Sequence, residues 1–171
     1  RRSLGGRVPW IAGFLLLLCG SAGVPCNAQC DSAALARADT LLARRSLKPA
    51  EKAYRKLVDK GACGAYAYRG LALWAMRSGE AGEKVIGLMN QAVGFAPQDP
   101  VMLRSRANAY DHYEMFERAL ADREAALPFV SGDSLRADYM TGQAFDLMSM
   151  QRNAEALELM ERAHNLDSLA P

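Results

Sequence analysis

The sequence has little of what most catalytic and metal-binding proteins depend on. Its 171 residues include only two histidines and four cysteines. No nucleophile elbow, phosphate-binding glycine loop or metalloprotease helix is present. Neither His112 nor His164 has a cysteine or a second histidine at the spacing of metal ligands, so we expect no metal site and no cofactor. These absences argue against an enzyme, which stays only as a third alternative.

The sequence also lacks an excess of positive charge once its first residues are set aside. Lys and Arg total 21 and Asp and Glu total 19, but Arg1, Arg2 and Arg7 precede the first acidic residue, which leaves 18 basic and 19 acidic side chains in 29–171. Proteins that bind nucleic acid normally carry a basic surface that neutralises phosphates. We therefore expect no nucleic-acid partner. With 50% hydrophobic and 23% charged residues, the composition is that of one folded domain.

The longest apolar run is too short for an ordinary membrane span. It covers residues 10–24, between Pro9 and Pro25, whereas a spanning helix needs about 20 residues. A basic start, an apolar run and then small residues form the order of a secretory signal peptide. An uncleaved anchor is the alternative. If the leader is removed, contact with a membrane is only transient.

Small residues mark the expected cleavage site. Cys26 and Ala28 stand three residues and one residue before the cut, so residues 1–28 are predicted to be the signal peptide and 29–171 the mature chain. Ala22 and Gly23 are alternative sites. We expect an exported protein, located in a periplasm, on an outer surface or in the secreted space.

Small residues recur along the mature chain with a period of about 34 residues, and such a period indicates a repeat architecture. Three sets of equivalent positions, here called columns, recur at nearly the same intervals. The first is Ala38, Ala72, Ala107 and Ala144, the second is Ala50, Val85, Ala119 and Ala156, and the third is Leu57, Ala92, Ala126 and Ala163.

Each repeat is predicted to form two short helices. Apolar residues lie at helical spacing around every alanine of the first column, and the second and third columns fall on a following helix. Only a short turn fits between the two, so each unit is predicted to be an antiparallel hairpin. Small residues at facing positions let two helix backbones approach closely. Asp99 before Pro100 reads as an N-cap, and Gly61 and Gly79 suit helix ends.

Cys30 and Cys63 are the two cysteines that would remain after cleavage. They flank the first predicted hairpin, and the outer ends of an antiparallel hairpin are neighbours, so a Cys30–Cys63 disulfide is predicted. Two free thiols are the alternative.

The residues of these columns resemble the tetratricopeptide repeat. The third unit matches best, with Leu103, Ala107 and Tyr110 on its first helix and Ala119 and Ala126 on its second. The resemblance covers about 32–168, in units of about 32–60, 65–97, 100–131 and 137–168. It departs from the family where Arg37, Arg106 and Gln143 stand in place of an apolar residue.

The resemblance implies an all-α fold: a right-handed α-solenoid of about four tetratricopeptide-like hairpins, with a concave groove lined by the first helices. A single hairpin leaves its apolar face exposed to water, and stacking it on the next hairpin buries that face. This physical argument supports the same architecture.

The groove is expected to carry the binding residues. They are Tyr66, Arg69, Leu73, Arg77, Arg104, Asn108, His112 and Phe145. Arg104 and Asn108, one helical turn apart, resemble part of the clamp with which some members of the family hold a terminal carboxylate, although the companion basic residues are absent. Solvated surface arginines are the alternative interpretation. The eight methionines are interpreted as core residues more readily than as a binding surface.

The function expected is a non-enzymatic scaffold that binds a protein or peptide, acidic or ended by a carboxylate. The rival is an assembly subunit that packs end-on in a larger envelope complex without a free peptide ligand. The final helix carries more apolar residues than its neighbour can cover, so self-association through the last hairpin is a further hypothesis. These residues are Ala156, Leu157, Leu159, Met160, Ala163 and Leu166.

Overall fold

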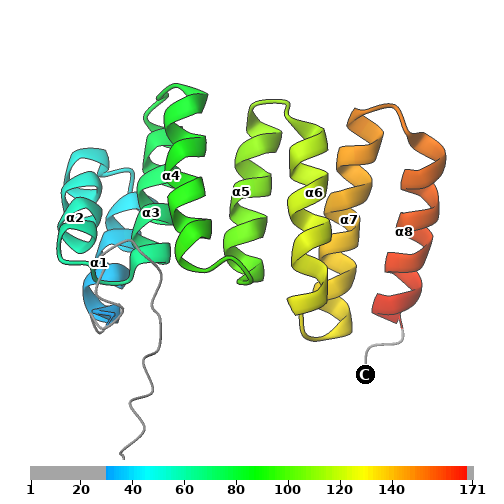
Figure 1. Ribbon diagram of the computed structural model, residues 1–171, viewed down its shortest axis with the longest axis horizontal. Coiled ribbons are helices and arrows are strands. Elements are labelled where there is room, and N and C mark those ends of the chain that lie inside the picture. The colour runs from blue at the N-terminus through cyan, green and yellow to red at the C-terminus, as the bar shows by residue number, and fades with distance from the viewer. Residues whose placement is uncertain (1–29, 169–171) are drawn as a thin grey trace, which may run out of the picture.

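The structure, a computed structural model, describes residues 30–168, which hold eight α-helices, one 3₁₀ helix and no strand (Figure 1). The helices are α1 (Ser32–Ala43), α2 (Leu47–Asp59), α3 (Gly64–Arg77), α4 (Gly82–Phe95), α5 (Pro100–His112), α6 (Phe116–Ala126), η1 (Leu127–Phe129), α7 (Asp133–Ser149) and α8 (Asn153–Ser168). The predicted signal peptide lies outside the described residues. Across 30–168, no helix combines the length and the apolar character that a membrane crossing requires.

The helices pair in chain order into four hairpins that stand side by side along the long axis (Figure 1). The predicted all-α solenoid of four hairpins is confirmed. The fourth hairpin begins at Asp133 and not at residue 137, because α7 starts directly after Gly132. Before it, η1 shapes the longer connection from α6.

Small residues hold the stack together, as their recurrence predicts. The four first-helix alanines are fully buried, and the second-column residues on α2, α4, α6 and α8 are at most 1% exposed. A larger side chain at these positions would separate the helix backbones, since protein interiors have few voids that could accommodate it.

The first helices line the inner side of the stack. α3 contacts both α1 and α5, and these contacts are more extensive than those between successive second helices. A binding groove is therefore expected on the inner faces of α3, α5 and α7.

The first helix of every hairpin ends in the same way. Arg45, Gly79, Glu114 and Gln151 occupy equivalent places and all have positive φ, between 57° and 74°. The next residue in each case donates its backbone N–H to a carbonyl five residues back, as in Ser46 to Leu41 and Met115 to Tyr110. This left-handed turn favours glycine, yet only the second hairpin has one.

The three polar residues that depart from the family pattern lie in different surroundings. Arg106 donates to both carboxylate oxygens of Asp122 and to Asn90 Oδ1. Gln143 is only 4% exposed. Arg37 is exposed on α1, which no hairpin precedes in residues 30–168.

The predicted disulfide is present. Cys30 and Cys63 are bonded, with their Cα atoms 4.5 Å apart, and join the start of α1 to the start of α3. The methionines divide between core and surface. Met89 and Met102 are fully buried, whereas Met148 and Met160 are 52% and 45% exposed.

Candidate binding groove

Four of the eight predicted groove residues converge on one pocket. Arg69 from α3, Arg104 and Asn108 from α5, and Phe145 from α7 line a cavity of about 410 Å³. Arg123, which sequence reasoning missed, reaches the same cavity from α6. The rest of the lining is Ser105, Asp138, Tyr139, Thr141 and Gly142.

The other four lie outside this pocket. Tyr66 is 41% exposed and donates to Asp99. Leu73 packs against the core of the first hairpins. Arg77 donates to the backbone carbonyl of Leu42 at 2.9 Å and so ties α3 to α1. His112 is exposed, with its ring edge-on to a neighbouring tyrosine.

Arg69 is held in place by a hydroxyl group. Its Nε donates to Ser105 Oγ at 2.7 Å, and that hydroxyl donates in turn to the carbonyl of Val101. No protein group in residues 30–168 accepts from the two terminal nitrogens of Arg69. They are therefore available to a ligand in the pocket.

Arg104 lies between a carboxylate and an aromatic ring. Its guanidinium donates to Asp138 at 2.9 Å, and it also lies over the ring of Tyr139, 5.3 Å from the centroid. The side chains of Arg104 and Asp138 are 39% and 63% exposed, and exposed ion pairs contribute about 0–1 kcal/mol. A ligand carboxylate can therefore replace Asp138 at little cost.

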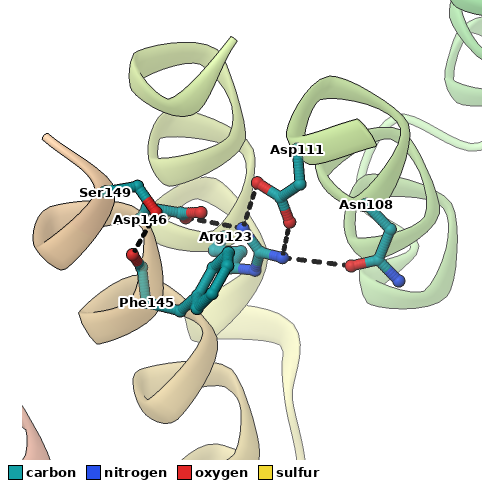
Figure 2. A network of polar contacts seen from close by, with 6 residues as sticks. All are labelled: Asn108, Asp111, Arg123, Phe145, Asp146 and Ser149. Carbon is teal, nitrogen blue, oxygen red and sulfur yellow. Dashed lines mark hydrogen bonds and ion pairs between the residues drawn. The ribbon is translucent and has the colours of Figure 1, made fainter. Parts of the chain in front are cut away.

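Asn108 is oriented by Arg123, as Figure 2 shows. Arg123 donates to Asn108 Oδ1 at 3.0 Å. A guanidinium can only donate, so the amide must turn its oxygen toward Arg123 and its NH₂ group away. This fixes Asn108 as a donor on the side away from Arg123. Arg69, Arg104 and Asn108 together supply N–H groups suited to a carboxylate, while Phe145, 56% exposed, adds an apolar wall.

Arg123 is the centre of a buried network beneath the pocket (Figure 2). Only 6% exposed, it donates to Asp111 on α5 and to Asp146 on α7. Asp146 is fully buried, and its Oδ1 has no hydrogen-bond donor in the described part of the chain. The network therefore joins three helices of the last two hairpins through charged groups.

The acid–base properties of Asp146 follow from its burial. Desolvation, followed by a hydrogen bond with the carboxyl group of Asp111, raises the pKa of Asp146 to about 7, against the opposing charge of Arg123. A proton on Asp146 relieves the repulsion between two carboxyl groups that share one guanidinium.

The network requires a glycine on α7. A Cβ atom at position 142 would lie 2.6 Å from Nε and 3.0 Å from Cδ of Arg123. Gly142 thus leaves the space through which Arg123 passes between the helices.

A signal for this network exists in the repeat. Arg123 follows the second-column residue by four positions, where the other hairpins have Tyr54, Met89 and Met160. Arg123 is a charged residue in an otherwise apolar column, and Asp146 stands where the second and third hairpins have Trp74 and Ala109. The two together indicate a buried ion pair.

No metal site was predicted. Within residues 30–168, no group of three His, Cys, Asp or Glu side chains is placed to hold a metal ion.

No protein-family model and no curated protein matches the sequence. Solved structures do match. The chain is similar to YrrB, described as a tetratricopeptide-repeat protein with an unusual peptide-binding site, at 14% identity and a TM-score of 0.64, over 81% of this chain and 69% of that one. It is also similar to MamA, at 14% identity and a TM-score of 0.68, over 80% of this chain and 78% of that one. A MamA structure from Desulfovibrio magneticus is similar at 12% identity and a TM-score of 0.65, over 80% of this chain and 75% of that one. These likenesses and the four hairpins show that the chain has the fold of a tetratricopeptide-repeat solenoid.

Proposed function

We propose that the protein is a non-enzymatic scaffold that binds a protein segment through the pocket between α3, α5 and α7. The observation that carries the proposal is the convergence of Arg69, Arg104 and Asn108 beside the exposed ring of Phe145. The peptide-binding site described for YrrB, on the same fold, supports it.

The chemistry of the pocket favours a carboxylate next to an apolar side chain. The free nitrogens of Arg69, the guanidinium of Arg104 and the NH₂ group of Asn108 can donate to a carboxylate, whether a chain end or an acidic side chain. Phe145 can cover the apolar neighbour. We also propose that the protein acts outside the cytoplasm, on the basis of the leader and of the disulfide.

Binding of a fluorescein-labelled pool of hexapeptides with free carboxyl ends, followed by fluorescence polarisation, tests the proposal. The same pool with amidated ends distinguishes a terminal carboxylate from an acidic side chain. Arg104→Glu should raise the Kd at least tenfold, because it places a repulsive charge where the ligand carboxylate binds.

The matched control is Arg152→Glu, at an exposed residue in the turn directly before α8. It should change the Kd less than twofold. Equal effects of the two substitutions would contradict binding in this pocket.

A second candidate is an assembly subunit that packs end-on in a larger complex. Leu157 and Met160, 60% and 45% exposed on α8, favour it. A pull-down from envelope extract distinguishes the two candidates, since a scaffold releases a peptide and an assembly subunit elutes in a stable stoichiometric complex.

A further inference from the structure

At two of the three joints between neighbouring hairpins, a large residue of the second helix packs onto a glycine of the next first helix. Tyr54 on α2 packs onto Gly70 on α3, where an added Cβ would come within 2.1 Å of the tyrosine ring. Arg123 on α6 packs onto Gly142 on α7 in the same way, at 2.6 Å. The large residue follows the second-column residue by four positions, and the small one precedes the first-column alanine by two.

Within residues 30–168, the first and last helices carry the residues of this joint without a neighbouring hairpin to pack against. Met160 on α8 takes the place of the large residue and is 45% exposed, whereas Tyr54 and Met89 are fully buried at the equivalent place. Ala36 on α1 takes the place of the small residue and is exposed. Leu157, one turn before Met160, is 60% exposed.

The surface around Met160 is hollowed. A cavity of about 450 Å³ lies along α7 and α8 and is lined by Ala137, Thr141, Met160 and Ala163, together with polar residues at its rim. In the first three hairpins, the equivalent face of the second helix packs against the first helix of the next hairpin.

Charge adds a second complementary pair. At the joint of the second and third hairpins, Arg106 on α5 donates to Asn90 on α4 at 3.0 Å. The equivalent residues at the free ends are Arg37 on α1 and Glu161 on α8. Both are exposed, and neither has an ion-pair partner in residues 30–168.

We infer that the α8 face of one molecule binds the α1 face of a second copy, head to tail, as a further joint of the solenoid. Met160 of the first copy packs onto Ala36 of the second, and Glu161 pairs with Arg37. Because the two faces differ, the contact is heterologous and each added molecule leaves another free end. Association therefore continues into short chains with rising concentration.

Sedimentation velocity of the purified protein, with its disulfide intact, tests this inference over a concentration series. Arg37→Glu and Glu161→Arg should each weaken association about tenfold or more, because each places like charges opposite one another. An equimolar mixture of the two variants should associate again, and so should the doubly substituted protein, since both restore opposite charges. Met160→Lys should abolish association.

Lys52→Glu and Glu158→Arg are the matched controls. They reverse charge on α2 and α8 at a place that is exposed in all four hairpins. Neither should change association, and circular dichroism should show the same helix content in every variant.

A protein that stays monomeric over the whole series would overturn the inference. So would association that survives Met160→Lys, or that the mixture of charge variants fails to restore. Arg104→Glu should weaken peptide binding and leave sedimentation unchanged, because Arg104 lines the groove pocket and not the cavity along α7 and α8. Failure of the proposed groove can therefore be distinguished from failure of this contact.

Discussion

Replacing Arg123 with methionine removes the cation that lies between Asp111 and Asp146. Asp146 is fully buried, and its Oδ2 would lose the Arg123 donor while Oδ1 already has none in the described residues. Breaking a buried pair by removing one partner typically costs about 3–5 kcal/mol, because an uncompensated charge stays buried. We expect Arg123→Met to lower the free energy of unfolding by that amount at pH 8.

The cost should depend on pH. The pKa of Asp146 is raised to about 7, so its carboxyl group is neutral at pH 5 and needs no cation there. At pH 5 the substitution removes only the contacts with Asp111 and Asn108 and the packing of the side chain. We expect roughly half of the loss measured at pH 8.

The same pKa gives the wild-type protein a characteristic pH profile. A carboxyl group whose pKa is raised in the folded state binds its proton more tightly there than in the unfolded chain. Its contribution to stability is therefore complete below about pH 4 and is lost as the pH rises through 7. The shift from 3.8 to about 7 corresponds to at most about 4 kcal/mol.

A second substitution should rescue the first. The joint of the second and third hairpins has Met89 and Ala109 at the places of Arg123 and Asp146, and both are fully buried in one apolar cluster. Arg123→Met with Asp146→Ala therefore copies the two fully buried positions of an apolar joint that this chain already contains, while Asp111, with a side chain 18% exposed, keeps access to water. Because buried ion pairs replaced by packed apolar residues often gain stability, we expect the double variant to equal or exceed the wild type at pH 8.

Urea denaturation followed by circular dichroism at pH 5 and pH 8 measures all three proteins. Arg104→Met is the control, since its ion pair with Asp138 is exposed and should contribute less than about 1 kcal/mol. Two results would contradict this prediction: a loss of stability for Arg123→Met at pH 8 no larger than that of the control, or a double variant no more stable than the single one.

Two further predictions concern the turns and the disulfide. Glu114→Gly should raise the free energy of unfolding by about 1 kcal/mol, because Glu114 has a φ of 58° that glycine adopts without strain; equal or lower stability in thermal melts would contradict this. Cys30→Ser with Cys63→Ser should lower stability by about 3–4 kcal/mol through the loss of a cross-link over 33 residues. Urea denaturation measures that loss, and two free thiols in an Ellman titration of the denatured, unreduced wild type would contradict the bridge.

The hairpins and the bridge could be predicted because they depend on local spacing. Ala38 and its equivalents are buried wherever the repeat places them, and Asp99 caps α5 at Val101 as the Asp-Pro pair indicates. The disulfide needed only the expectation that the ends of the first hairpin meet. In each case the positions in the chain determine the geometry without knowledge of distant contacts.

The pocket was predicted only in part, because helical spacing gives the face of a residue and not its partners. Arg69 and Arg77 lie two turns apart on α3, yet Arg69 lines the pocket while Arg77 donates to the carbonyl of Leu42 on α1. Arg123 was missed because charged residues on amphipathic helices are usually assigned to the solvated face. Its burial depends on Asp111 and Asp146, which belong to different hairpins.

Arg123 links the stability of the stack to the proposed binding site. The guanidinium that joins α6 to α5 and α7 also turns the NH₂ group of Asn108 away from the network, and it forms part of the pocket wall. An apolar joint would hold the hairpins together equally well, but it would leave the Asn108 amide free to present either end. The buried charge therefore has a role that packing alone cannot supply, since it fixes the direction of a hydrogen-bond donor at the point where the groove would meet a carboxylate.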